Sequence, residues 1–202
     1  MLECINVSCY RGERRLFNNL SFSANKGSVT IITGGNGSGK TTLLRAIIGF
    51  FPIRSGSIKF HNCPIKLSDS YTSQVTYIGH KNACNDTFTV LENLKFWAAL
   101  KDTQELVEAA VCFLGINQVL DIQYKNLSAG WKRKVALSRL LIYNTLIWVI
   151  DEPFTNLDHN SIQLITELIS IRQKQNGIII VADNKANINF TPCQIINIES
   201  FF

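Results

Sequence analysis

The chain has 202 residues and a formal net charge of +5, and 46% of its residues are hydrophobic. This length and composition suit one globular α/β domain that buries a sizeable core, with room for an inserted subdomain. They exclude a chain that crosses a membrane by itself, because the longest apolar run, residues 140–150, is about half the length that spans a bilayer. The mild positive charge permits contact with an anionic membrane surface or a nucleic acid but favours neither.

The six cysteines lie far apart and form neither a C-x-x-C pair nor a Cys/His cluster. A zinc site is therefore not expected. Residues 1–15 are polar and mixed and contain no targeting segment, so we expect reduced thiols in a cytosolic-type compartment.

Two strands are predicted at the N-terminus, over residues 2–10 and 15–24. Residues 25–27, Asn-Lys-Gly, form a turn that returns the chain into a third strand, an apolar and β-branched run over 29–33. Consecutive strands this close predict an antiparallel β lobe.

Residues 34–41 read G-G-N-G-S-G-K-T and match the phosphate-binding P-loop pattern G-x-x-x-x-G-K-[ST]. The match lies between the strand 29–33 and a predicted helix over 41–48, which makes it far more specific than a glycine-rich turn alone. Glycines let backbone N–H groups approach phosphate oxygens, and the helix N-terminus adds a partial positive charge. Lys40 would reach the β- and γ-phosphates of a nucleotide, and the Thr41 hydroxyl would bind Mg²⁺. The candidate phosphate-binding residues are Gly34, Gly35, Asn36, Gly37, Ser38, Gly39, Lys40, Thr41 and Thr42.

Tyr10 lies on the predicted antiparallel lobe beside this loop. Its ring would stack on a flat adenine base, a contact worth about 1–3 kcal/mol. The other interpretation is an ordinary aromatic residue at a sheet edge, and the sequence does not choose between the two. Phe17 is a weaker candidate for the same role.

A helical segment follows the short strands predicted over 58–60 and 75–79. Thr89 and Glu92 have the spacing of a capping box, which predicts a helix through Leu100. A second helical pattern covers 102–114, and residues 131–143 are predicted to form one further helix. We interpret residues of about 86–145 as a helical subdomain inserted into a single domain of residues 1–202.

The apolar strand predicted over 146–150 ends in two carboxylates, Asp151 and Glu152. An Asp at the carboxyl end of a buried strand is the partner that a P-loop needs to hold Mg²⁺. The neighbouring Glu152 would orient and deprotonate a water molecule for attack on the γ-phosphate. The alternative, a strand that simply enters solvent, is weaker because the second acid follows the first directly.

A helix over 160–175, a buried strand over 178–181 and a short strand over 194–198 complete the chain. Strands that alternate with helices predict a mostly parallel central sheet, with ligands at the carboxyl ends of its strands. The predicted fold class is therefore α/β, a P-loop NTPase with an antiparallel β lobe and an inserted helical subdomain.

Residues 127–131 read L-S-A-G-W and are close to the L-S-G-G-Q signature of the ABC ATPases. Residues 151–158, D-E-P-F-T-N-L-D, look like the Walker B motif and D-loop of that family, and the motifs occur in the family's order over essentially the whole chain. Together with residues 77–80, Y-I-G-H, these segments resemble the ATP-binding subunits of cytochrome c maturation (haem exporter) transporters.

The resemblance implies an ABC-type ATPase in which two copies pack head to tail. ATP and Mg²⁺ would lie between the P-loop of one copy and Ser128, Ala129 and Gly130 of the other, with Ser128 as the N-cap of a helix aimed at the γ-phosphate. ATP binding would close the dimer, hydrolysis would release it, and a transmembrane subunit would convert this motion into transport. The chain would then lie peripherally on the cytoplasmic face of the inner membrane and bind no nucleic acid.

Two positions depart from the family pattern. His80 stands at the family's usual Q-loop glutamine, where it would contact water or metal or be a bystander. Asp183 stands where most members have a His that contacts the γ-phosphate. An anionic side chain there would repel the phosphate unless it is protonated or turned away. The candidate catalytic residues are Lys40, His80, Glu152 and Asp183.

The leading function is an ATP-binding and ATP-hydrolysing subunit that energises a membrane ABC transporter, with haem export for cytochrome c biogenesis implied by the resemblance. The alternative is a nucleotide-gated assembly subunit with little turnover, because Asp183 replaces the switch His. A soluble family member that acts on DNA or ribosomes is disfavoured, because the sequence has neither tandem domains nor a long coiled-coil insertion. The membrane partner would dock on a groove formed by residues 80–86 and part of the helix 89–100, where Phe96 and Trp97 are either contact or core residues.

Overall fold

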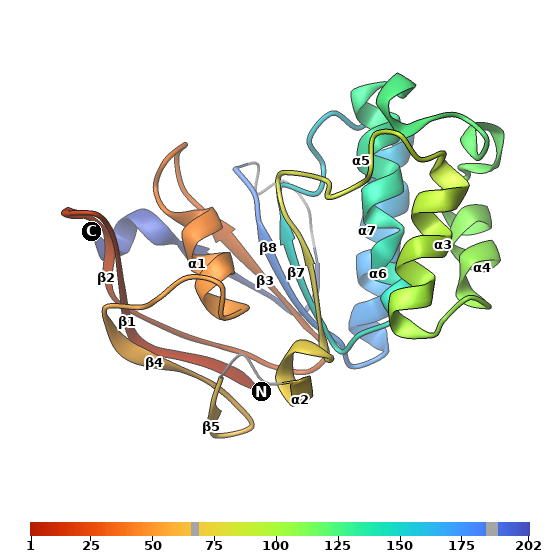
Figure 1. Cartoon of the computed structure of the whole chain (residues 1–202). Coiled ribbons are helices and arrows are strands. Elements are labelled where there is room, and N and C mark those ends of the chain that lie inside the picture. The colour runs from red at the N-terminus through yellow and green to blue at the C-terminus, as the bar shows by residue number, and fades with distance from the viewer. Residues whose placement is uncertain (66–68, 185–189) are drawn as a thin grey trace.

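A five-stranded parallel sheet forms the centre of the computed structural model, which describes residues 1–65, 69–184 and 190–202 (Figure 1). The strand order is β6-β7-β8-β3-β9, and every neighbouring pair is parallel. The predicted α/β fold class with a parallel central sheet is thereby confirmed. The strands are β3 (Ser28–Thr33), β6 (Val75–Ile78), β7 (Ile147–Asp151), β8 (Ile178–Ala182) and β9 (Cys193–Asn197).

A second sheet, which is antiparallel and has four strands, forms the predicted β lobe. Its strand order is β2-β1-β4-β5. Figure 1 shows the helix α1 (Lys40–Ile47) between the two sheets, and its buried residues pack with both of them. The strands are β1 (Leu2–Arg11), β2 (Arg14–Ala24), β4 (Ser55–Phe60) and β5 (Cys63–Pro64).

The two faces of the parallel sheet pack against different layers. In β7, Ile147 and Val149 pack with α1 and the antiparallel sheet, whereas Trp148 and Ile150 pack with the helices on the other face. Successive side chains of a strand point to opposite faces, so a strand covered on both sides needs apolar residues throughout. Burial of each such large side chain stabilises the fold by about 1.5–3 kcal/mol.

Between β6 and β7 the regular secondary structure is helical, apart from an isolated bridge between Thr89 and Gln123. The predicted capping box is confirmed: the Glu92 N–H donates to Thr89 Oγ1 (3.2 Å), and the Thr89 N–H donates to the Glu92 carboxylate (2.7 Å). The subdomain boundaries of about 86–145 remain an interpretation. The helices are α3 (Val90–Lys101), α4 (Leu106–Leu114), α5 (Ala129–Leu137) and α6 (Arg139–Tyr143), with the 3₁₀ turns η1 (Asn117–Val119) and η2 (Tyr124–Asn126).

The prediction of one helix over 131–143 is wrong, because α5 ends at Leu137 and α6 begins at Arg139. Ser138 Oγ donates a hydrogen bond of 2.6 Å to the Val135 carbonyl, and a serine hydroxyl bound to its own turn competes with regular helix geometry. The first of the two helices also begins earlier than predicted. Its N-cap is Ser128, as expected, and the Ser128 hydroxyl accepts from the Trp131 N–H (3.4 Å).

Helix α7 (His159–Lys174) packs on the same face of the parallel sheet as α3 to α6, through Ile165, Leu168 and Ile169. It is the longest helix of the described chain, with 16 residues. Within the described residues, no helix has the length and apolar character needed to cross a bilayer. The short elements α2 (Asp69–Thr72) and η3 (Ile198–Phe201) precede β6 and follow β9.

Candidate nucleotide-binding and catalytic site

The predicted P-loop joins the carboxyl end of β3 to the first residue of α1. Its backbone favours glycine at three positions, because Gly34, Gly37 and Gly39 have φ angles of +146°, +78° and +104°. Space is also limited at Gly34, where a Cβ would lie 2.7 Å from Ile198 Cγ2 and 2.8 Å from Ser38 Oγ. The loop is thus a narrow backbone cradle at a helix N-terminus, an arrangement that suits a phosphate group.

Two polar side chains of this loop fit a phosphate ligand. Lys40 is 6% exposed, and its Nζ donates to the carbonyl oxygens of Gly34 (2.7 Å) and Gly35 (2.9 Å). Ser38 Oγ is buried and has no hydrogen-bond partner within the part of the chain that the structure describes. A buried hydroxyl is normally paired, and a phosphate oxygen in the cradle would supply the missing partner.

The Thr41 hydroxyl and the Asp151 carboxylate meet at the carboxyl edge of the parallel sheet. Thr41 Oγ1 donates a hydrogen bond of 2.8 Å to Asp151 Oδ2, and Asp151 is 2% exposed. Burial raises the pKa of Asp151, while the Thr41 hydrogen bond and the charge of Arg133 act in the opposite direction. A hydroxyl and a carboxylate are hard oxygen ligands of the kind that Mg²⁺ takes, so this pair fits the predicted metal.

Glu152 has an unusual backbone conformation directly after β7. Its φ angle is +50°, and its N–H donates to the Ala182 carbonyl at the end of β8 (2.8 Å). A left-handed backbone at a residue other than glycine stores strain, and such residues cluster in active sites. His80 Nδ1 lies 3.8 Å from Glu152 Oε2, and the two side chains are 74% and 29% exposed. The fold therefore brings these two predicted catalytic residues together at a solvent-accessible position.

The segment after β8 carries the predicted switch residue and a second polar residue. Asp183, the predicted switch residue, is 8% exposed, and its N–H donates to the Ile32 carbonyl (3.1 Å). The next residue, Asn184, is exposed, and its Nδ2 donates to Asn36 Oδ1 in the P-loop (2.8 Å). Sequence reasoning missed Asn184, although it follows the predicted residue directly.

Glu199 is a second residue that sequence reasoning missed. Its Oε1 accepts a hydrogen bond from the Gly35 N–H (2.8 Å), so a carboxylate from η3 touches the P-loop backbone. No sequence signal marks this contact, because it depends on the parallel pairing of β9 with β3, which brings the C-terminal segment to the loop.

The signature-like residues Ser128, Ala129 and Gly130 lie at the start of α5 and line a pocket of about 490 Å³ together with residues 156–158. A Cβ at Gly130 would lie 2.8 Å from the Asn156 carbonyl oxygen, so glycine allows these two segments to pack closely. No P-loop residue of the described chain lines this pocket. The signature-like segment and the P-loop are thus two separate surfaces of one chain.

The aromatic candidates fall into two groups. Tyr10 is 37% exposed on β1, whereas Phe17 is fully buried and has no free face for a base. Tyr10 therefore keeps its candidate role and Phe17 loses it. On α3, Trp97 is 3% exposed and belongs to the core, while Phe96 is 51% exposed and can meet a partner.

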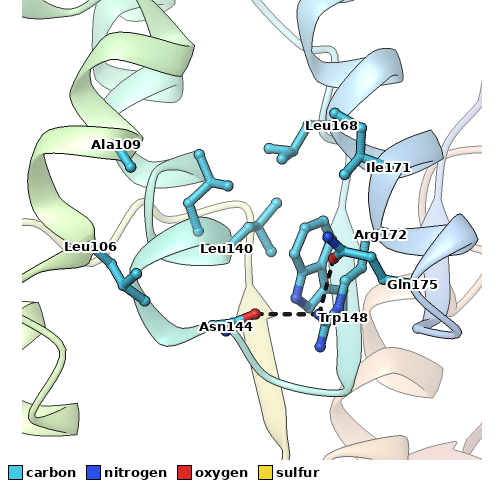
Figure 2. Close-up of a pocket in the computed structure, with 10 residues that line it drawn as sticks. Leu106, Ala109, Leu140, Asn144, Trp148, Leu168, Ile171, Arg172 and Gln175 are labelled. Atoms are coloured by element: carbon cyan, nitrogen blue, oxygen red, sulfur yellow. Dashed lines mark hydrogen bonds between the residues drawn. The ribbon is translucent and has the colours of Figure 1, made fainter.

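A further pocket lies between the helical layer and β7, and Figure 2 shows its walls. Arg172 Nη1 donates to Asn144 Oδ1 (3.3 Å) and Gln175 Oε1 (3.4 Å), and the guanidinium lies over the Trp148 ring, 5.5 Å from its centroid. None of the residues predicted from the sequence to bind nucleotide or metal lines this pocket. It is not part of the candidate site.

A protein-family model described as "ABC transporter" matches residues 17–155. The chain belongs to the ABC transporter family. A curated relative from Wolbachia pipientis wMel, named cytochrome c biogenesis ATP-binding export protein CcmA, is 50% identical over 204 residues, which cover 100% of this chain and 98% of that protein.

Solved structures of ABC transporter proteins share the fold of the chain. A putative ABC transporter ATP-binding protein from Pyrococcus furiosus has a TM-score of 0.85 at 24% identity, over 99% of this chain and 98% of that one. The ATP-binding cassette MJ0796, solved as a dimer bound to ADP and Pi, has a TM-score of 0.82 at 20% identity, over 93% of this chain and 90% of that one. The predicted ABC-type fold is thereby confirmed.

As a member of the ABC transporter family, the chain is an ATPase that binds ATP and couples its hydrolysis to transport. The predicted family and activity are confirmed. The alternative of an assembly subunit with little turnover finds no support in these comparisons.

Proposed function

We propose that this ABC transporter ATPase energises haem export for cytochrome c biogenesis. The observation that carries the proposal is its 50% identity, over the whole chain, with a relative named for export in cytochrome c biogenesis. The cradle at residues 34–41 and the contact between Thr41 and Asp151 supply the local geometry that ATP-driven work needs.

In the proposed site the P-loop backbone and the α1 N-terminus bind the phosphates of ATP. Lys40 donates to the β- and γ-phosphate oxygens. The Ser38 hydroxyl, which has no partner among the described residues, donates to another oxygen of the triphosphate. Thr42 follows on the first turn of α1, beside the phosphates. Tyr10 stacks on the adenine base from the antiparallel lobe.

Hydrolysis needs a polarised γ-phosphate and an oriented water molecule. Thr41 and Asp151 would hold Mg²⁺, which when bound neutralises charge on the β- and γ-phosphates. Glu152 accepts the proton of the attacking water, and its strained backbone fixes the direction of its carboxylate. His80 lies against Glu152 on the solvent side and helps to hold that carboxylate in place.

We further propose a head-to-tail dimer, in which the pocket at Ser128, Ala129 and Gly130 of one copy faces the ATP on the P-loop of the other. The separation of the two surfaces in one chain supports this arrangement, because the pocket at the signature-like segment is lined by no described P-loop residue. The N-terminus of α5, capped by Ser128, would then add its partial positive charge at the γ-phosphate.

The proposed partner outside the dimer is a transmembrane subunit rather than a nucleic acid. We place the candidate docking site on residues 80–86 and the exposed Phe96 of α3, because His80 in this segment lies against Glu152. The chain would therefore lie peripherally on the cytoplasmic face of the inner membrane.

The proposal is tested in cells whose only copy of the chain carries Glu152→Gln. We expect these cells to lose covalently bound haem in their c-type cytochromes, because the export step has no hydrolysis to drive it. Glu167→Gln, which changes an exposed glutamate on α7, is the matched control and should leave the haem content unchanged. Normal c-type cytochromes in Glu152→Gln cells that contain wild-type amounts of the chain would contradict the proposed function.

A further inference from the structure

Arg133 is a buried cation whose hydrogen bonds join three parts of the catalytic region. It lies on α5, is 5% exposed, and directs its guanidinium toward the carboxyl edge of the parallel sheet. Nη1 donates to the Gly79 carbonyl (2.9 Å) and to Asn82 Oδ1 (3.1 Å). Nη2 donates to the backbone carbonyls of Asp151 (2.5 Å) and Glu152 (3.0 Å).

Burial of the Arg133 guanidinium costs free energy, which indicates that its contacts have a role in the structure. All four of these acceptors are neutral oxygens, so no carboxylate hydrogen-bonds to the buried charge in this network. Taking a charge out of water in this way carries a desolvation penalty, which only well-placed hydrogen bonds from its donors offset. A guanidinium fits the task because its donors form a rigid planar fork, which a lysine ammonium does not offer.

The contacts of Arg133 connect two segments to one helix. Gly79 and Asn82 belong to the segment that contains His80. The other two acceptors are the backbone carbonyls of Asp151, the candidate metal ligand, and Glu152, the candidate base. The helix that supplies the arginine begins at Ser128, the signature-like segment. A displacement of α5 therefore acts on both segments through one side chain.

We propose that Arg133 is a positioning residue for ATP hydrolysis. It holds the backbone of Glu152 and the segment that carries His80 in fixed positions relative to α5. The inference rests on the proposed role of Glu152 as the base that activates water. Misplacement of a reacting group by about 1 Å costs about 100-fold in rate. Loss of the fork should therefore reduce the chemical step far more than it reduces ATP binding at the P-loop.

Arg139 is a matched control on the neighbouring helix α6. It is 8% exposed, donates from Nη2 to the Asn82 carbonyl (2.8 Å), and has its guanidinium 4.8 Å from the centre of the Trp97 ring. It thus shares the burial of Arg133 and the contact with the same loop. Within the described chain, its hydrogen bonds do not include the backbone of Asp151 or Glu152.

The experiment compares Arg133→Met, Arg133→Lys and Arg139→Met, each as the full chain assembled with its membrane partner. The measured quantities are kcat, KM for ATP, the Kd of ATP and the thermal midpoint of unfolding. We expect Arg133→Met to lower kcat by about 10- to 100-fold with the Kd of ATP within about threefold of wild type. Arg133→Lys should recover part of kcat, because it keeps the charge and one set of donors, and Arg139→Met should keep kcat within about threefold.

Two results would overturn the inference. The first is a wild-type kcat in Arg133→Met or, where that variant does not fold, in Arg133→Lys. The second is an equal loss in Arg133→Met and Arg139→Met, which would show that general packing of the helical segment is responsible. A wild-type chain with no turnover above Glu152→Gln would instead remove the proposed function on which the inference rests, so the two failures are distinguishable.

Discussion

The Thr41 hydroxyl donates a hydrogen bond of 2.8 Å to the carboxylate of Asp151, which lies 110 positions further along the chain. This contact joins the first turn of α1 to the end of β7 and brings together the two predicted ligands of Mg²⁺. It is the point at which the candidate phosphate cradle meets the strand that leads into the candidate site residues Asp151 and Glu152.

Asp151→Asn should abolish most of the Mg²⁺ dependence of ATP binding, because an amide keeps the shape of the carboxylate but not its charge. We expect the gain in ATP affinity on adding Mg²⁺ to fall by about 10- to 100-fold. The measurement is ATP titration with Mg²⁺ and with a chelator, and Asp121→Asn, an exposed aspartate, is the control. An unchanged Mg²⁺ effect in Asp151→Asn would show that the metal ligand is elsewhere.

His80→Ala should lower kcat by about tenfold, because His80 lies against Glu152, the candidate base. The Kd of ATP should stay unchanged, because the proposed contacts of ATP do not include His80. His80→Gln tests the family pattern, in which a glutamine occupies this position, and should keep kcat within about threefold of wild type. Steady-state turnover and equilibrium ATP binding separate the two parameters. If His80→Ala turns over as fast as wild type, His80 is a bystander.

Asp183→Asn and Asn184→Ala distinguish two views of the segment after β8. Because Asn184 contacts Asn36 of the P-loop while Asp183 is buried at the strand end, we expect Asn184→Ala to lower kcat about tenfold. Asp183→Asn should stay within about threefold of wild type. A turnover that rises tenfold or more in Asp183→Asn would mean that the Asp183 charge restrains hydrolysis.

Tyr10→Ala should weaken ATP binding by about 5- to 150-fold, the equivalent of a stacking contact of about 1–3 kcal/mol. Tyr10→Phe keeps the ring and should bind ATP as wild type does. Binding of a triphosphate without a base is the internal control, since it should be equal in all three proteins. Equal ATP affinities for Tyr10→Ala and wild type would assign Tyr10 to the sheet edge alone.

Much of the fold could be predicted because its signals are local. The strand β7 is recognisable as a continuous apolar run, since both of its faces are covered, and the P-loop is recognisable from glycines that its positive φ angles require. The capping box of Thr89 and Glu92 is equally local, and the structure contains both of its hydrogen bonds.

The remaining features depend on distant parts of the chain. Phe96 and Trp97 are adjacent on α3, yet only the packing of the other helices decides that Trp97 is buried and Phe96 is exposed. The contacts of Asn184 and Glu199 with the P-loop arise from the arrangement of β8, β9 and β3 in the sheet. The helix break at Ser138 accompanies a hydrogen bond from its hydroxyl to the Val135 carbonyl, and the sequence does not reveal this bond because a serine within a helical pattern can equally point to solvent.

The most direct test of the whole account is ATP turnover by the full chain assembled with its transmembrane partner, measured beside the same complex carrying Glu152→Gln. The account predicts turnover by the wild-type complex at least about 100-fold above that of the variant, with equal ATP binding by both. Equal turnover by the two complexes, with ATP bound to each, would contradict the assignment of Glu152 and of the site built around it.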